Sequence, residues 1–239
     1  MRAGGLLRAG GLMLASPGTF PALTLADVAA EPGKLWYDVP LRNGAAPGDG
    51  PLLLYRPLVA EDVDDLTAFL EALSPATREW WYRECYDRAG AEELCAAIGR
   101  YDKLRMVAVD PRRPEAGLLA LFEFSFGIPP GDHFRYGLYG VTLDEARDCR
   151  FGPCVRDDQQ GRGLGSALMP ATFDIGRRFG KQRVFLWGGV YADNHTAVAF
   201  YRKHGFEEIG RFCSMDDRVS ADMIRDLDVA RTSNSFNSK

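Results

Sequence analysis

The segment CVRDDQQGRGLGSALM, from Cys154 to Met169, decides the fold prediction. An apolar strand pattern ends at Val155, a polar turn follows, and three glycines then introduce a helical pattern. Gly161, Gly163 and Gly165 have no Cβ, so their backbone N–H groups can approach a ligand closely. The first N–H groups of a helix lack intrahelical partners and carry partial positive charge. The segment therefore predicts a binding site for an anion such as a pyrophosphate.

Two common nucleotide-binding patterns do not fit this segment. A P-loop requires GxxxxGK[ST], and no lysine follows these glycines. A dinucleotide fingerprint requires GxGxxG in an early β-α-β unit, whereas GRGLGS has another spacing and lies late in the chain. A third pattern, Gln/Arg-x-x-Gly-x-Gly/Ala between a strand and a helix, is matched by Gln160, Gly163 and Gly165.

A second motif lies downstream, in YADNHTAVAFYRKHGF. The pattern Asn-x-x-Ala-x-x-x-Tyr-x-x-x-Gly-Phe is matched by Asn194, Ala197, Tyr201, Gly205 and Phe206. With both motifs, the chain resembles the GNAT superfamily of acyl-CoA N-acyltransferases. The resemblance covers residues 52–227 and is strongest over 154–206.

The apolar periodicity predicts an α/β domain. Its order is one strand, two or three helices, three strands, a helix, a strand, a helix and two strands. The resemblance implies an α/β (α+β) fold: a GNAT-like mixed, mostly antiparallel sheet of six to seven strands, flanked by helices, with splayed central strands. Residues 1–50 read as an irregular extension and linker that packs loosely on the domain or not at all, and 35–41 could form one short strand within it. Residues 51–228 read as the acetyltransferase domain and 229–239 as a disordered tail.

Four local predictions bear on the site. The long segment 127–148 exceeds ordinary loop lengths, so we expect it to hold a hairpin or a functional loop. The apolar run 183–190 reads as one strand. Gly152 and Pro153 interrupt the strand before the glycines and suggest a β-bulge. Pro170 falls inside the following helix, where it should produce a kink.

The resemblance implies acetyl-CoA as co-substrate and assigns residues to it. The strand 151–155 would hold the pantetheine arm through its backbone, including Cys154 and Val155. Asn194 would contact the cofactor near the splayed strands, and Tyr201 would protonate the leaving CoA thiolate. The pyrophosphate would be held by the loop residues Gln160, Gly161, Arg162, Gly163, Leu164, Gly165 and Ser166. Transfer would be direct, without an acyl-enzyme on Cys154.

The sequence motifs assign no residue to the role of general base. An amine with a pKa near ~10.4 is mostly protonated at neutral pH, so a group must remove a proton before attack. Glu123, within an apolar strand, is the candidate, although it could equally face solvent. Glu145, Asp148 and His133 in the long segment are alternatives.

Other site candidates also have structural explanations. Tyr201 could be a structural tyrosine, and Asn194 could be an N-cap, a ligand contact or both. The aromatic cluster Trp80, Trp81 and Tyr82 reads as core, with a border of the acceptor site as the alternative.

Composition limits the partners. The net charge is -4 and the isoelectric point about 5.5, which argues against nucleic acid. Five cysteines without CxxC and three scattered histidines predict no metal site and reduced thiols in a cytoplasmic protein. The apolar run at 11–15 is too short for a secretion signal, and no run reaches a membrane span of about 18 residues.

We therefore expect an N-acetyltransferase that acts on an amine of a small molecule or a protein, as a monomer or homodimer, with no membrane partner. Two alternatives remain. One is a non-catalytic CoA-binding or regulatory module, and the other is a transferase that uses a longer acyl-CoA.

Overall fold

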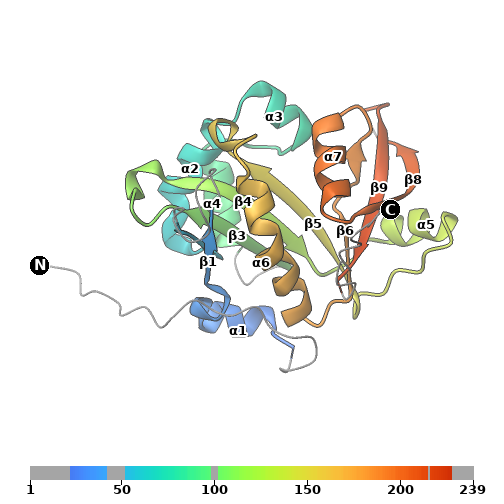
Figure 1. Ribbon diagram of the computed structural model, residues 1–239, viewed down its shortest axis with the longest axis horizontal. Helices are drawn as coiled ribbons and strands as arrows, with labels where there is room; N and C mark the ends of the chain where they lie inside the picture. Colours follow the sequence, from blue (N-terminus) through green and yellow to red (C-terminus); the bar gives the residue numbers. More distant parts are fainter. Residues whose placement is uncertain (1–21, 42–51, 98–101, 215, 228–239) are drawn as a thin grey trace, which may run out of the picture.

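A single mixed sheet organises the chain. The computed structural model describes residues 22–41, 52–97, 102–214 and 216–227. In these residues the strand order is β1-β2-β3-β4-β5-β6-β9-β7, and β8 pairs with β9 (Figure 1). The strands are β1 (Tyr37–Pro40), β2 (Leu52–Pro57), β3 (Lys103–Val109), β4 (Leu118–Ser125), β5 (Asp148–Val155), β6 (Arg183–Leu186), β7 (Val190–Tyr191), β8 (Glu207–Cys213) and β9 (Val219–Asp226). The α-helices are α1 (Leu25–Ala30), α2 (Val63–Glu71), α3 (Pro75–Trp80), α4 (Arg88–Ala96), α5 (Pro130–Leu138), α6 (Leu164–Arg178) and α7 (His195–Lys203).

The sheet is mostly antiparallel, as predicted. Only β5 and β6 run parallel to each other among the paired strands of the described residues. The strand count differs from the expected six to seven, because β1 joins the sheet and the run 183–190 divides into β6 and β7. The division falls at Gly188 and Gly189, whose φ values of +73° and +72° lie in the left-handed region that ends a strand.

Helices cover both faces of the sheet, and this explains why all eight residues of β4 are buried. On one face, Leu168 and Ile175 of α6 share a core with Phe122 of β4. On the other face, Leu66 of α2 packs with Leu121 of β4, within a cluster that also includes α4. Figure 1 shows α6 across the sheet, with α2 and α4 at the opposite end from α5 and α7.

The expectation of loose packing is wrong for residues 22–41. β1 pairs antiparallel with β2, and Tyr37 and Val39 are buried while Asp38 and Pro40 are exposed. The Tyr37 hydroxyl also donates to Asp174 Oδ2 of α6 at 2.9 Å. A two-residue alternation over only four positions is too short to distinguish an edge strand from a linker. The predicted boundary at 51, the residues 1–21 and the tail 229–239 lie outside the described residues.

Replacing Tyr37 with Phe tests this attachment. The change removes one hydrogen bond to a buried carboxylate, and we expect the free energy of unfolding to fall by about 1–2 kcal/mol. The melting temperature should drop by a few degrees, measured by circular dichroism. Tyr82→Phe is the matched control because the side chain of Tyr82 is 79% exposed. Equal melting temperatures for all three proteins would contradict the attachment.

The segment 127–148 contains a helix rather than a hairpin. Pro130 occupies the first turn of α5, where its missing N–H costs nothing. The helix buries Tyr136, whose ring lies 4.9 Å from that of Phe185. Phe134 and Leu138 are 71% and 69% exposed, so the apolar residues of this short helix do not follow one stripe. This explains why periodicity did not reveal it.

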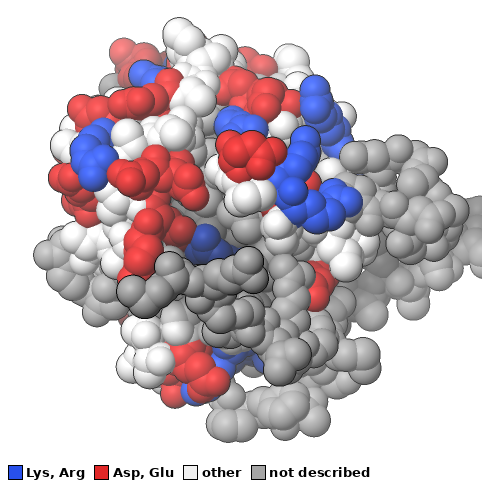
Figure 2. All heavy atoms as spheres, turned by 90° about the vertical axis from the view of Figure 1, so that its left-hand side faces the viewer, with Lys and Arg blue, Asp and Glu red and all other residues white. Residues whose placement is uncertain are grey.

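The described surface mixes charges of both signs. Figure 2, which turns the left-hand side of Figure 1 toward the viewer, shows Asp and Glu side chains interspersed with Lys and Arg. The residues described on this face therefore form no continuous basic surface of the kind that binds a phosphate backbone. Within the described ranges, no helix is long and apolar enough to cross a membrane. The same ranges hold no group of three or more His, Cys, Asp or Glu side chains suited to a metal ion.

Candidate active site

The two parallel strands separate in the middle of the sheet. The pairing of β5 with β6 runs from Asp148 to Phe151 and ends there. The Trp187 N–H donates to the Phe151 carbonyl at 2.8 Å, beyond the last paired residues. β5 continues to Val155 on β4 alone, so its backbone has no strand partner on the β6 side after this point. This is the splay expected of the central strands.

The expected bulge at Gly152 and Pro153 is wrong. The register between β4 and β5 is continuous from Ser125↔Arg150 to Ala120↔Val155. Phe151 faces β6 through its carbonyl, and residues two apart in a strand face the same side, so the Pro153 nitrogen also faces β6. Proline has no N–H to donate there. Because β5 no longer pairs with β6 at this position, no hydrogen bond between the strands is lost. Proline thus helps to separate the strands without distorting β5.

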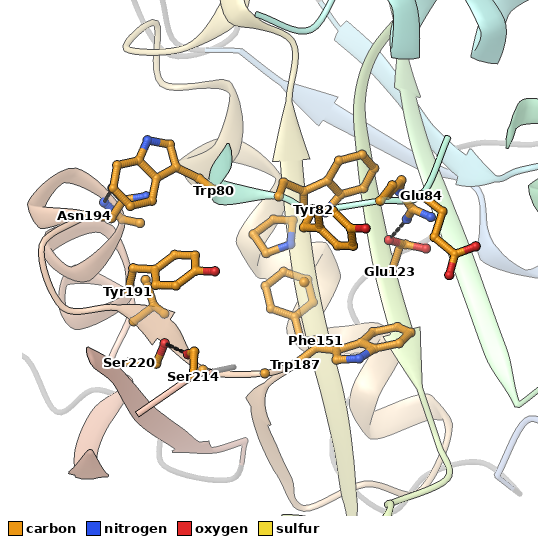
Figure 3. Close-up of a pocket in the computed structure, with 18 of the residues that line it drawn as sticks. Trp80, Tyr82, Glu84, Glu123, Phe151, Trp187, Tyr191, Asn194, Ser214 and Ser220 are labelled. Carbon is orange, nitrogen blue, oxygen red and sulfur yellow. Dashed lines mark hydrogen bonds and ion pairs between the residues drawn. The ribbon is translucent and has the colours of Figure 1, made fainter. Parts of the chain in front are cut away.

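A cavity of ≈ 650 Å³ opens at this separation (Figure 3). Its walls come from β5, the turn between β6 and β7, the segment after α3, and α7, with further residues from β3, β4, α4 and β9. Figure 3 shows Asn194 and Tyr191 on one side of the cavity and Glu123 on the other, with Phe151 between them. Sequence-distant elements therefore meet around the unpaired backbone of β5.

The glycine loop follows the end of β5, and its residues 160–166 are not among those that line the cavity. Gly161 and Gly163 have φ values of +69° and +83°, which L side chains adopt at a cost. Gly163 is the N-cap of α6, so the helix begins at Leu164. Gly165 is favoured for a different reason, which is the close approach of α7 to α6. A Cβ at this position would lie 3.3 Å from Phe200 Cε2 of α7. Pro170 is exposed and α6 continues through it to Arg178.

Side chains fix this loop to its neighbours. Gln160 Nε2 donates to the Val155 carbonyl at 2.9 Å and to Thr77 Oγ1 at 3.2 Å. Asp157 accepts from the Ser74 N–H at 2.9 Å and from the Ser74 and Thr77 hydroxyls at 2.6 and 2.7 Å. The Gln160 side chain therefore shapes the loop, while the backbone N–H groups in the first turn of α6 lack intrahelical partners.

Asp157→Asn tests this anchoring. Burial acts to raise the Asp157 pKa, but the hydrogen bonds from Ser74 and Thr77 outweigh it, so the pKa is lowered. A lowered folded-state pKa gives a stabilisation that is complete above the ordinary value of about 3.9 and disappears as pH falls through the folded value. We expect Asp157→Asn to unfold about 1–2 kcal/mol more easily at pH 7. In urea titrations this difference should shrink below about pH 4; a constant difference down to pH 2 would contradict the assignment.

Basic side chains surround the start of α6. Ser166 Oγ lies 3.0 Å from His204 Nε2 and 3.5 Å from Lys203 Nζ at the end of α7. Arg162 is exposed in the loop itself. Sequence reasoning named Ser166 and Arg162 but missed Lys203 and His204. Only the close packing of α7 on α6 brings them to this helix N-terminus.

Tyr201 and Asn194 both line the cavity from α7. Tyr201 is 8% exposed, and burial, with a smaller contribution from nearby Cys154, raises the pKa of its phenol far above the ordinary value. Its hydroxyl therefore stays protonated at neutral pH. Asn194 Oδ1 accepts from the Ala197 N–H at 3.0 Å, so this residue is the N-cap of α7 while it also faces the cavity.

Glu123 points into the cavity from β4, but it is already paired. Its Oε1 accepts from Arg105 Nε at 2.8 Å, and its Oε2 forms an ion pair with Arg83. The three alternative bases lie elsewhere. Asp148 pairs with Arg183 at 2.7 Å, Glu145 accepts from the Ile128 N–H, and His133 is exposed on α5.

The aromatic cluster forms cavity wall, and Trp81 also packs against the core cluster that includes Leu66 of α2. Trp80, Trp81 and Tyr82 all line the cavity, and none of them is fully buried. The structure adds residues that sequence reasoning missed, namely Arg83, Lys103, Arg105, Trp187, Tyr191, Ser214 and Ser220. Arg105 and Glu123 could have been recognised as a pair from the sequence, because each is a charged residue inside one of two consecutive apolar strands. Cys154 is buried, and burial raises the pKa of its thiol, which disfavours the nucleophilic thiolate.

Comparison with known proteins agrees with this geometry. The model of the Acetyltransferase (GNAT) family matches residues 151–206, the stretch from the strand separation to the end of the second motif. Two curated relatives and three solved structures that resemble the chain are acetyltransferases or GNAT-family proteins as well. The chain has the GNAT fold.

Two curated relatives support the resemblance. An uncharacterized N-acetyltransferase of Methanocaldococcus jannaschii is 41% identical over 54 residues, which is 23% of each chain. An acetyltransferase of Pseudomonas aeruginosa is 29% identical over 139 residues, 57% of this chain and 66% of the relative. The chain thus matches less than two thirds of the length of either relative.

Solved structures extend the similarity to most of the described chain. The GNAT domain of S. lividans PAT superposes with a TM-score of 0.57 at 20% identity, over 82% of this chain and 98% of that one. Spermidine N-acetyltransferase from Vibrio cholerae, solved with CoA and spermine, gives 0.54 at 19% identity, over 73% and 95%. Aminoglycoside acetyltransferase AAC(6')-Ib, solved with coenzyme A, gives 0.56 at 17%, over 73% and 94%. At these identities the similarity establishes the GNAT fold alone.

Proposed function

We propose that this GNAT-fold chain is an acetyl-CoA-dependent N-acetyltransferase, with Tyr201 as general acid and an amine of a small molecule or protein as acceptor. The observation that carries the proposal is the cavity at the separation of β5 from β6, which Tyr201 and Asn194 line. The GNAT neighbours from Vibrio cholerae and AAC(6')-Ib were solved with CoA or acetyl-CoA, which supports CoA as the co-substrate.

The residues present fit an elongated acyl-CoA. The N–H groups of Leu164, Gly165 and Ser166 begin α6 and would hold the pyrophosphate, with Arg162 nearby. The unpaired backbone of Cys154 and Val155 would hold the pantetheine arm as an added strand does. The Asn194 amide nitrogen is not used in the cap and faces the same region.

The chemistry requires three proton transfers: one from the ammonium before attack, one to the departing sulfur, and one from the nitrogen of the tetrahedral intermediate. Acetyl-CoA supplies the activated acyl group, and the amine nitrogen attacks its carbonyl carbon after losing a proton. We propose that Glu123 receives this proton through a water molecule, because both carboxylate oxygens already accept from arginines. Tyr201 would donate its phenolic proton to the departing sulfur, and the resulting phenolate would regain a proton from the nitrogen as the amide forms. Holding the two reactants together supplies much of the rate. A backbone N–H of β5 would stabilise the developing oxyanion.

Calorimetric titration with acetyl-CoA, followed by a free-thiol assay with a panel of amines, tests the proposal. Micromolar binding together with amine-dependent thiol release is the expected result. Binding without transfer to any amine would favour the non-catalytic CoA-binding module. Faster turnover with a longer acyl-CoA would favour the second alternative. Absence of binding to acetyl-CoA, CoA and longer acyl-CoA would overturn the proposal.

A further inference from the structure

The cavity contains a buried cluster with unequal charge. Arg105 and Glu123 lie opposite each other on β3 and β4, and their side chains are 7% and 6% exposed. Arg83, in the segment after α3, is 18% exposed and pairs with the same carboxylate. Two guanidinium groups therefore share one carboxylate, which leaves one positive charge in excess. A buried charge without a counterion is costly, so this arrangement favours an anionic ligand.

Two nitrogens of this cluster are buried without a hydrogen-bond partner. They are Arg105 Nη1 and Arg83 Nε, and each belongs to a residue that lines the cavity. Buried guanidinium N–H groups in native proteins nearly always find an acceptor. A guanidinium matches a carboxylate well, because its planar set of donors can bind both oxygens. The unsatisfied donors and the excess positive charge thus both favour a ligand that carries a carboxylate.

The aromatic walls do not offer an alternative site for a cationic acceptor. Arg218 lies 4.3 Å from the Trp80 ring centroid and 4.1 Å from that of Tyr191. Arg83 lies 4.1 Å from the ring of Trp81. These three rings are already faced by cations of the protein, so they are not an empty cage for an ammonium group.

We propose that the acceptor carries a carboxylate close to its reacting amine, as an α-amino acid does. This deepens, and rests on, the proposed N-acetyltransferase function. The acceptor carboxylate binds Arg83 and Arg105, and the adjacent ammonium lies beside Glu123, which is the proposed proton acceptor. The negative end of the zwitterion thus meets the two arginines, and its positive end meets the glutamate of the same cluster. The cavity wall also includes the apolar side chains of Phe151, Pro153 and Val190, which favours an acceptor with an apolar or aromatic side chain.

Matched acceptors test this inference. Phenylalanine, phenylalaninamide and phenethylamine share a ring and an amine but differ in the carboxylate. We expect kcat/KM for phenylalanine to exceed that of the other two by about tenfold to a hundredfold, the effect of a charge-assisted hydrogen bond. Two outcomes would overturn the inference and leave the N-acetyltransferase proposal intact, provided that acetyl-CoA binds. One is an equal kcat/KM for the three acceptors, and the other is turnover only of the acceptors that lack a carboxylate. Failure of acetyl-CoA binding identifies a failure of the proposed function itself.

Arginine variants assign the effect to these residues. Arg105→Gln and Arg83→Gln should each raise the KM for phenylalanine by about tenfold or more and barely change that for phenethylamine. Arg88→Gln, on the exposed face of α4, is the matched control and should change neither value. Because Arg105→Gln leaves a buried carboxylate with one partner fewer, the charge-retaining variants Arg105→Lys and Arg83→Lys are prepared alongside, with folding checked by circular dichroism. An unchanged selectivity ratio in the folded variants would contradict the assignment.

Discussion

Tyr201→Phe is expected to lower kcat by about a hundredfold to ten-thousandfold, the range found when a positioned general acid is removed. The substitution deletes only the hydroxyl, and Phe fits the same buried site between Phe200 and Phe206. Because burial raises the pKa of this phenol, it remains a proton donor throughout the accessible pH range. The wild-type kcat should therefore show no loss from Tyr201 ionisation up to about pH 10.

Separate binding and turnover measurements make this result specific. The dissociation constant for acetyl-CoA, from calorimetry, should stay within about twofold, because an acid acts on the leaving group rather than on binding. Tyr139→Phe makes the same chemical change outside the cavity, where the hydroxyl donates to the Arg211 carbonyl, and should keep full turnover. A Tyr201→Phe enzyme as fast as the wild type would exclude the acid role and return Tyr201 to a structural one.

Gly163→Glu/Gly165→Glu is expected to weaken acetyl-CoA binding by at least about a hundredfold. At Gly163 a side chain must adopt a φ of +83°, and at Gly165 a Cβ meets Phe200 at 3.3 Å. Each glutamate also brings a negative charge to the N-terminus of α6, where the pyrophosphate would bind. Steric strain and charge repulsion therefore act in the same direction.

A glutamate placed elsewhere controls for charge and folding. Gly131 lies in the first turn of α5, where a Cβ has nothing within 4 Å, so Gly131→Glu should leave acetyl-CoA affinity unchanged. Circular dichroism shows whether the double variant keeps its fold. If the folded double variant binds acetyl-CoA as tightly as the wild type, the glycine loop is a structural turn and the cofactor site lies elsewhere.

The sequence predicted these features because they depend on neighbours along the chain. The glycines mark the start of α6, since positive φ is a local requirement. Asn194 and Tyr201 are seven residues apart on one helix, so a local pattern places both on the same side. Apolar periodicity likewise predicted an α/β domain, because burial persists over most of the seven or eight positions of β3 and β4.

Other features depend on contacts that no local pattern encodes. The attachment of β1 rests on pairing with β2 and on a hydrogen bond between residues 137 positions apart, Tyr37 and Asp174. The helix α5 is stabilised by Tyr136 against Phe185 rather than by an apolar stripe. Short elements of this kind gain most of their stability from tertiary packing, so their sequences carry a weak signal.

The sequence by itself determined the glycine loop, the Asn and Tyr motif and hence the GNAT-type fold, because each is a short-range constraint on backbone and helix geometry. Only the tertiary structure decided the character of the cavity. It brought Glu123 between Arg105 of the neighbouring strand and Arg83 of a distant segment, and left two buried guanidinium nitrogens without partners. The charge balance of a buried site is a sum over side chains from several elements, and that sum exists only once the sheet has formed.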